Sequence, residues 1–153
     1  MIRVGVISDT HGLLRPEACR ALRGCDRILH AGDVGKPEIL ESLQQIAPVV
    51  AIRGNNDRGP WADALPCTEA VEIGGALVYL VHDLAELDLD PAAARFAAVV
   101  SGHSHRPSAT VRQGVLFLNP GSAGPRRFHL PVSLAILTVR GGVVRPRLLE
   151  LRV

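Results

Sequence analysis

The 153-residue sequence is poor in cysteine and in aromatic side chains, and each shortage excludes a class of protein. Its three cysteines, Cys19, Cys25 and Cys67, are odd in number and form no C-x-x-C pair. They therefore predict neither a disulfide framework nor a zinc knuckle, and we expect reduced, mostly structural thiols. Aromatic residues make up 3% of the chain, which leaves Val, Leu, Ile and Ala to build the core.

Long apolar runs and dense charge are also missing. No run approaches the roughly 18 apolar residues that a membrane-spanning helix needs, and no signal-length apolar segment follows Met1. The net charge of +2 is small and the arginines are scattered, so nothing indicates a nucleic-acid partner. We therefore expect a single cytoplasmic domain over residues 1–153 with no membrane partner. The sequence is also compatible with a homo-oligomer.

The first half of the chain alternates strand-like and helix-like segments. Residues 2–8, 27–29 and 49–52 are short apolar runs typical of strands, whereas residues 16–22 and 37–46 have a helical pattern. This alternation favours parallel strands joined by crossover helices, with binding loops at the carboxyl ends of the strands.

The second half is different, because its apolar runs are separated by glycine-rich pairs. The strand-like runs are 70–73, 77–81, 97–101, 109–112, 115–118 and 134–139, and the pairs Gly74-Gly75, Gln113-Gly114 and Gly141-Gly142 predict hairpin turns. The two halves together predict an α/β fold, in which two mixed sheets pack face to face with helices outside.

Five short polar segments interrupt the apolar runs, and each follows a predicted strand. They are Asp9-Thr10-His11, Gly32-Asp33, Gly54-Asn55-Asn56-Asp57, His82-Asp83 and Gly102-His103-Ser104-His105. Taken singly, each is typical of a turn, a helix cap or a hydrogen-bonded core histidine. Together they place four of the six histidines, two aspartates and an asparagine at strand exits. This conjunction predicts a metal centre.

The ordered set D-x-H, G-D, G-N-x-D, a lone histidine and G-H-x-H resembles the calcineurin-like metallophosphoesterase superfamily over residues 5–122. Residues 52–57 and the run Asn119-Pro120-Gly121-Ser122 are most similar to its small prokaryotic phosphodiesterase branch. That branch shares its fold with the retromer scaffold subunit of eukaryotes. The resemblance implies a four-layer α/β/β/α sandwich with metals at one end.

The resemblance also implies how seven ligands divide between two divalent metal ions. Asp9, His11 and His105 would hold one ion, Asn55, His82 and His103 the other, and Asp33 would bridge them. Mn²⁺ is the family's usual activator, and the mixed N and O ligands also suit Ni²⁺, Fe²⁺ and Zn²⁺. Two such ions about 3.5 to 4 Å apart would turn a bridging water into a hydroxide that attacks phosphorus directly.

Asn56 stands where many monoester phosphatases of the superfamily have a histidine. A neutral amide cannot protonate a leaving alkoxide, and such acid catalysis is worth about 10² to 10⁴ in rate. Related small phosphodiesterases also lack this histidine, so the predicted substrate is a small-molecule phosphodiester. Asp33, Asn55, Asn56 and Asp57 are the predicted catalytic residues.

Four further residues are predicted near the substrate. Arg53 and Arg58 flank the G-N-N-D loop and would meet a phosphate, although ordinary surface arginines are the alternative. Asp83 replaces a glycine usual in the family, and would either support a ligand or face water. His30 would hydrogen-bond substrate or play a structural role, and His129 belongs to no motif.

A non-catalytic scaffold is the competing hypothesis, because the retromer relative shows that this fold can serve as a protein-binding surface. Loss of ligands would favour it. All seven ligand positions are filled here, which favours the enzyme.

Overall fold

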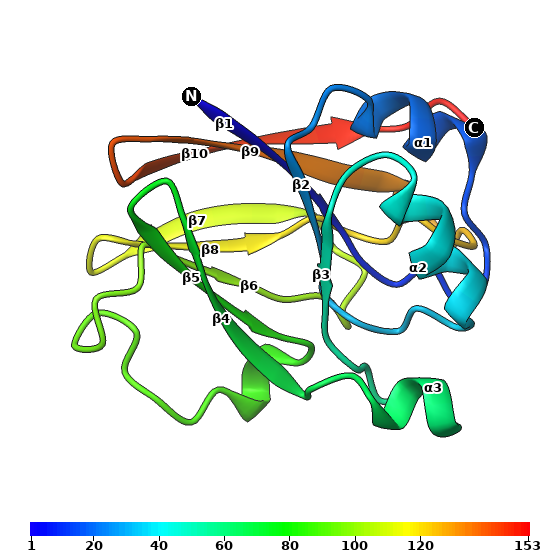
Figure 1. The fold of residues 1–153 in the computed structure, drawn as a ribbon, viewed down its shortest axis with the longest axis horizontal. Helices are drawn as coiled ribbons and strands as arrows, with labels where there is room; N and C mark the ends of the chain where they lie inside the picture. Colours follow the sequence, from blue (N-terminus) through cyan, green and yellow to red (C-terminus); the bar gives the residue numbers. More distant parts are fainter.

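The computed structural model describes residues 1–153 and consists of two mixed five-stranded sheets packed face to face (Figure 1). The strand orders are β10-β9-β1-β2-β3 and β4-β5-β6-β8-β7. The predicted α/β fold of two mixed sheets is confirmed. None of the helices has the length and apolar character needed to cross a lipid bilayer.

The first sheet combines the βα-alternating half of the chain with the C-terminal hairpin. Its strands are β1 (Ile2–Ile7), β2 (Arg27–His30), β3 (Val49–Ala51), β9 (Ser133–Arg140) and β10 (Val143–Glu150). The first three run parallel, and β9 and β10 add to the β1 edge in antiparallel pairs. Helices α1 (Pro16–Leu22) and α2 (Pro37–Gln44) connect the parallel strands, and each begins at a proline whose fixed φ suits the first helical turn.

The second sheet has a parallel centre and antiparallel edges. Its strands are β4 (Thr68–Ile73), β5 (Ala76–Val81), β6 (Ala98–Val100), β7 (Ser108–Arg112) and β8 (Val115–Asn119), and a short helix α3 (Pro60–Asp63) precedes them. The three predicted hairpin turns join β4 to β5, β7 to β8 and β9 to β10. Both residues of each turn have positive φ, as two-residue hairpins require.

The main core lies between the two sheets, and the alternation of side chains along β5 shows how it forms. Ala76, Val78 and Leu80 are buried against the first sheet, whereas Tyr79 and Val81 face the other way. The outward pair packs beneath residues 84–96, which contain the 3-10 helix η1 (Leu84–Glu86). The fourth layer is therefore an irregular segment with one short helical turn, while α1 and α2 cover the first sheet.

Candidate metal centre

The loops that follow β1, β2, β3, β5 and β6 meet at one end of the sandwich, and we call them the metal-centre loops. Backbone hydrogen bonds join them: Asp9 N donates to Gly32 O at 3.0 Å and Gly102 N donates to His82 O at 2.9 Å. Ser122, beyond β8, donates from Oγ to Asp9 O at 3.0 Å. Loops of both sheets therefore contribute to one site, as the strand-exit pattern predicted.

Five of the predicted ligands have left-handed backbone conformations. The φ angles are 55° at Asp9, 46° at His11, 54° at Asp33, 70° at His103 and 62° at His105, and only three other non-glycine residues of the chain share this region. Such conformations cost about 1 to 3 kcal/mol each and persist where the surroundings enforce them, often at functional sites. Five of the eight non-glycine residues with positive φ are therefore predicted ligands.

Asp9 lies at the point where three imidazoles converge. Its Oδ1 is 3.4 Å from His105 Nε2, 3.6 Å from His11 Nε2 and 3.8 Å from His82 Nε2. The residue is fully buried, yet Oδ1 has no hydrogen-bond partner, and neither has His82 Nε2. Buried polar atoms are normally satisfied, so these unpaired atoms indicate a missing ligand.

The other oxygen of Asp9 fixes the orientation of the carboxylate. Oδ2 accepts hydrogen bonds from Ser8 Oγ at 2.7 Å and from the His103 backbone N at 3.1 Å. Gly102 permits this approach, because a Cβ there would lie 2.6 Å from Asp9 Oδ2. Ser8 was not predicted as a site residue, because a serine at the end of a strand gives no indication of a hydrogen bond to the next residue.

Asp33 lies between the two groups of histidines. Its Oδ2 is 3.3 Å from His82 Nε2 and 3.7 Å from His11 Nε2. Asn56 holds this carboxylate with two donors, the backbone N to Oδ1 at 2.9 Å and Nδ2 to Oδ2 at 3.1 Å. An oxygen flanked by both groups suits an atom shared by two ions.

The donor set fits divalent metal ions. Ligand atoms about 2.0 to 2.2 Å from a tetrahedral ion lie about 3.4 Å from one another, close to the separations around Asp9 Oδ1. Two groups have ligand atoms within 4.8 Å of each other: Asp9, His11 and His105, and Asp9, Asp33 and His82. The first group is the set predicted for one ion.

The predicted second set is brought together less tightly. His82 is in a compact group, but Asn55 and His103 are exposed and line the adjoining pocket instead. The His103 ring lies edge-on to His82 at 5.4 Å between centroids, and its Nε2 is 3.7 Å from Asp83 Oδ2. Ligation by Asn55 and His103 remains a prediction.

Two of the predicted site residues, Asp57 and His30, make hydrogen bonds that support the metal-centre loops. Asp57 is nearly buried and accepts backbone hydrogen bonds from Val34, Gly35 and Gly54 at 2.9 to 3.1 Å. Its carboxylate thus ties the loop after β3 to the loop after β2, and the catalytic role of Asp57 remains a prediction.

His30 has the structural role that the sequence left open beside a substrate contact. It is fully buried; Gly32 N donates to its Nδ1 at 3.1 Å, so Nε2 carries the proton and donates to Thr10 Oγ1 at 3.0 Å. Burial lowers the pKa of His30 to about 4, which keeps the ring neutral. The histidine therefore supports the Asp9 loop and cannot reach a substrate.

Asn119 is a second supporting residue that the sequence did not reveal. Its Nδ2 donates to Gly102 O at 3.0 Å and to Ser104 Oγ at 3.1 Å, and Gly121 N donates to its Oδ1 at 2.9 Å. In the sequence, the run Asn119-Pro120-Gly121-Ser122 was notable only for its resemblance to the phosphodiesterase branch, which gave no contact for Asn119.

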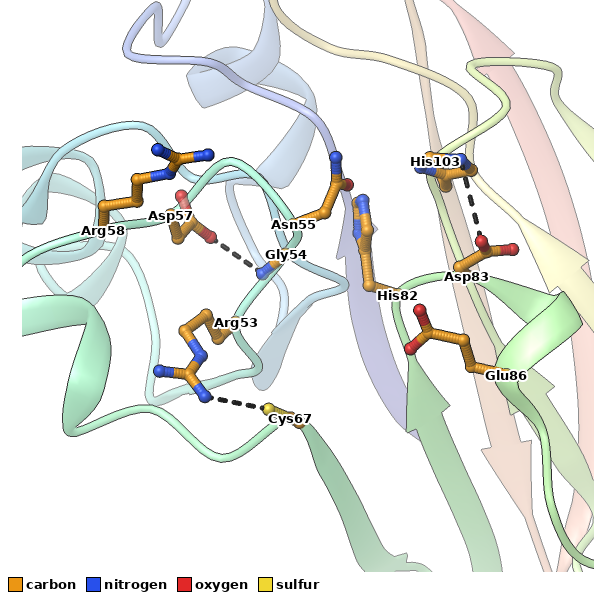
Figure 2. Close-up of a pocket in the computed structure, with 10 residues that line it drawn as sticks. All are labelled: Arg53, Gly54, Asn55, Asp57, Arg58, Cys67, His82, Asp83, Glu86 and His103. Atoms are coloured by element: carbon orange, nitrogen blue, oxygen red, sulfur yellow. Dashed lines mark hydrogen bonds and ion pairs between the residues drawn. The ribbon is translucent and has the colours of Figure 1, made fainter.

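A pocket of about 330 Å³ opens beside His82 (Figure 2). Three of the four predicted substrate residues line it, namely Arg53, Arg58 and Asp83, together with Asn55, His103 and Glu86. Three residues predicted to contact substrate therefore line a cavity next to the groups of metal ligands.

The carboxylates and imidazoles shift one another's protonation. Burial alone would raise the pKa of Asp9, but the adjacent His105 and His11 imidazoles and the hydrogen bond from Ser8 Oγ hold it well below its ordinary value. Burial would lower the pKa of His82, yet the Asp33 carboxylate beside Nε2 and the hydrogen bond from Nδ1 to Ala31 O raise it to about 9. In the metal-free protein His82 is therefore protonated at neutral pH.

This charge state predicts that metal binding releases protons. Because His82 must lose its proton to ligate, affinity for Mn²⁺ should rise with pH up to about 9. Calorimetry at pH 7.5 in two buffers of different ionisation enthalpy should detect about one proton or more released per protein. Binding without proton release would contradict the assignment.

The same pKa shift predicts how the stability of the metal-free protein depends on pH. The protonated His82 stabilises the fold at lower pH, so the protein should lose stability as pH rises through about 9.

A sandwich with a buried aspartate and histidine centre at its strand ends is typical of metal-dependent hydrolases. The profile of the calcineurin-like phosphoesterase superfamily domain matches residues 2–142, and the chain belongs to this superfamily. It is therefore a phosphoesterase by family.

Curated relatives agree with this membership. A "Probable metallophosphoesterase" of Methanothermobacter thermautotrophicus is 35% identical over 150 residues, covering 90% of this chain and 86% of that protein. A second, from Methanocaldococcus jannaschii, is 38% identical over 129 residues, covering 78% of this chain and 67% of that protein.

Solved structures show the same fold at low identity. An archaeal phosphodiesterase superimposes with a TM-score of 0.80 at 22% identity, over 97% of this chain and 100% of that one. Vps29 of Chaetomium thermophilum also gives 0.80, at 18% identity over 99% and 97%. The fold therefore occurs both in a phosphodiesterase and in Vps29.

Proposed function

We propose that this protein is a phosphodiesterase that uses two divalent metal ions, Mn²⁺ foremost. The ligands would be the seven predicted residues Asp9, His11, Asp33, Asn55, His82, His103 and His105. The observation that carries the proposal is the position of Asp33 Oδ2, 3.7 Å from His11 and 3.3 Å from His82, between the two ligand groups.

The metal ions would supply an activated water and neutralise phosphoryl charge. In the net reaction water adds to phosphorus, one P–O ester bond breaks, and the alcohol leaves with the electron pair and takes up a proton. Asn56 cannot supply that proton, because an amide is not an acid in this range and both its donors bind Asp33. Arg58 lines the pocket without an ion pair and is placed to bind a phosphoryl oxygen.

The substrate preference can be tested with two esters that share a leaving group. With Mn²⁺, bis(p-nitrophenyl) phosphate should be hydrolysed about tenfold or more faster, in kcat/KM, than p-nitrophenyl phosphate. The expectation follows from the resemblance to small phosphodiesterases that also lack a histidine at position 56, and not from leaving-group protonation, because both esters release the same p-nitrophenolate. Release of p-nitrophenolate measures both reactions, and the reverse ranking would sink the diester assignment.

A protein-binding role without catalysis is the second candidate, because Vps29 has the same fold. Mn²⁺ content measured after gel filtration, together with turnover of both esters, distinguishes the two. A chain that retains no metal and hydrolyses neither ester would be a scaffold.

A further inference from the structure

The pocket beside His82 has walls of opposite charge. Figure 2 shows Arg53 and Arg58 on one side and Asp83 and Glu86 on the other. Asp57 lies on the arginine side, but its carboxylate is already bound by three backbone N–H groups. The basic side comes from the loop after β3, and the acidic side from the segment that forms η1. A ligand that fills this pocket therefore meets both signs of charge.

The charges that remain free lie on opposite walls. Arg53 is already engaged by Asp63 Oδ1 at 3.3 Å and by Cys67 Sγ at 3.1 Å. Arg58 and Glu86 are exposed, and no ion pair or side-chain hydrogen bond joins either to another residue. One guanidinium and one carboxylate are thus available to a ligand.

Asp83 strengthens the acidic wall although it has local partners. Its Oδ1 accepts a hydrogen bond from Ala85 N at 3.0 Å, and its Oδ2 is 3.7 Å from His103 Nε2. The side chain keeps about a third of its surface exposed, so its charge still faces the pocket. Two carboxylates therefore border the same side of the cavity.

The inner end of the pocket is fixed by His82. This side chain is 6% exposed, and its Nε2 has no hydrogen-bond partner although it lines the cavity. The reacting phosphoryl group would lie at this end, beside the ligand groups. An ester arm that extends outward from it then passes the acidic wall.

We propose that this pocket selects a phosphodiester whose second ester arm carries a positive charge, that is, the ester of an amino alcohol. Arg58 would contact the anionic phosphoryl group, while Glu86 and Asp83 would face the ammonium group. The same carboxylates disfavour a second phosphate on that arm, so polyphosphates and oligonucleotides fit poorly. This inference rests on the proposed phosphodiesterase function and names its substrate class.

Two substrates that differ only in this charge test the proposal. They are p-nitrophenylphosphorylcholine and p-nitrophenyl 3,3-dimethylbutyl phosphate, in which a carbon atom replaces the quaternary nitrogen. With Mn²⁺ at low ionic strength, wild-type kcat/KM should favour the choline ester about fivefold. Glu86→Gln should lower this ratio about threefold, and adding Asp83→Asn should bring it close to one.

The control variant is Glu41→Gln, which removes an exposed carboxylate from α2 and should keep the wild-type ratio. Asn at position 83 keeps an acceptor for Ala85 N, so the start of η1 is preserved. A wild-type ratio near one, or a ratio that Glu86→Gln leaves unaltered, would overturn the proposal while leaving diester hydrolysis intact. Hydrolysis of neither ester would instead remove the phosphodiesterase function itself.

Discussion

Replacing Asp33 with asparagine should lower kcat/KM for bis(p-nitrophenyl) phosphate about a thousandfold. The variant loses the carboxylate charge whose Oδ2 lies between His11 and His82. The two donors of Asn56 that now hold that carboxylate would meet a weaker acceptor, so the orientation would also loosen. Steady-state rates and Mn²⁺ content of the purified variant measure the two effects together.

A matched replacement separates this effect from general damage. Asp88 is exposed in the segment that covers the second sheet, so Asp88→Asn should keep wild-type activity and metal content. Thermal unfolding of both variants without metal checks that the fold persists. An Asp33→Asn protein that keeps full turnover without bound metal would refute the dinuclear mechanism.

The largest expected effect on stability comes from Asp57. In Asp57→Ala, three backbone N–H groups lose their acceptor; those of Val34 and Gly54 are buried, and that of Gly35 is partly buried. The free energy of unfolding should fall by about 3 kcal/mol or more, because hydrogen bonds to a charged group are each worth about 1.5 to 3 kcal/mol. For a domain of this size the midpoint of thermal unfolding should drop by about 10 °C.

The measurement is best made on the metal-free protein, so that altered metal binding does not enter the result. Asp57→Asn is the graded control, because its one amide oxygen can replace part of the acceptor set; it should lose about half as much. A loss below about 1 kcal/mol in Asp57→Ala would show that water or neighbouring groups satisfy the three donors.

The sequence predicted the architecture well where apolar periodicity was strong. The parallel strands β1 to β3, helices α1 and α2 and all three hairpin turns lie where the patterns placed them. β10 was not predicted, because it is an edge strand with mostly exposed residues, several arginines and Pro146. Such a strand has no buried face to impose an alternating pattern.

The site was predictable in composition but not in its supporting contacts. Polar segments at strand exits identified Asp9, His11, Asp33, His82 and His105, all of which belong to compact ligand groups. The sequence pattern does not contain the hydrogen-bond partner that each polar residue finds on another loop.

Asn56 illustrates this limit. Its identity showed only that a proton donor is absent, whereas the fold shows both of its donors on the Asp33 carboxylate. The positive φ angles could not be predicted either, because Asp and His adopt them at only a minority of positions and the contacts of each loop decide which. The sequence therefore indicates the chemistry, and the tertiary contacts assign the supporting roles.

The origin of the ligands in both sheets has a consequence for folding. Asp9 and Asp33 follow strands of the first sheet, whereas His82 and His105 follow strands of the second. Neither sheet alone holds a complete group, so tight metal binding becomes available only after the two have docked. An ion that binds only the native state then stabilises it by RT ln(1 + c/Kd), where c is the free ion concentration, so the stabilisation grows with the logarithm of the ion concentration over its Kd. Bound metal would therefore stabilise the two docked sheets, and retention of metal would indicate that the sandwich is fully assembled.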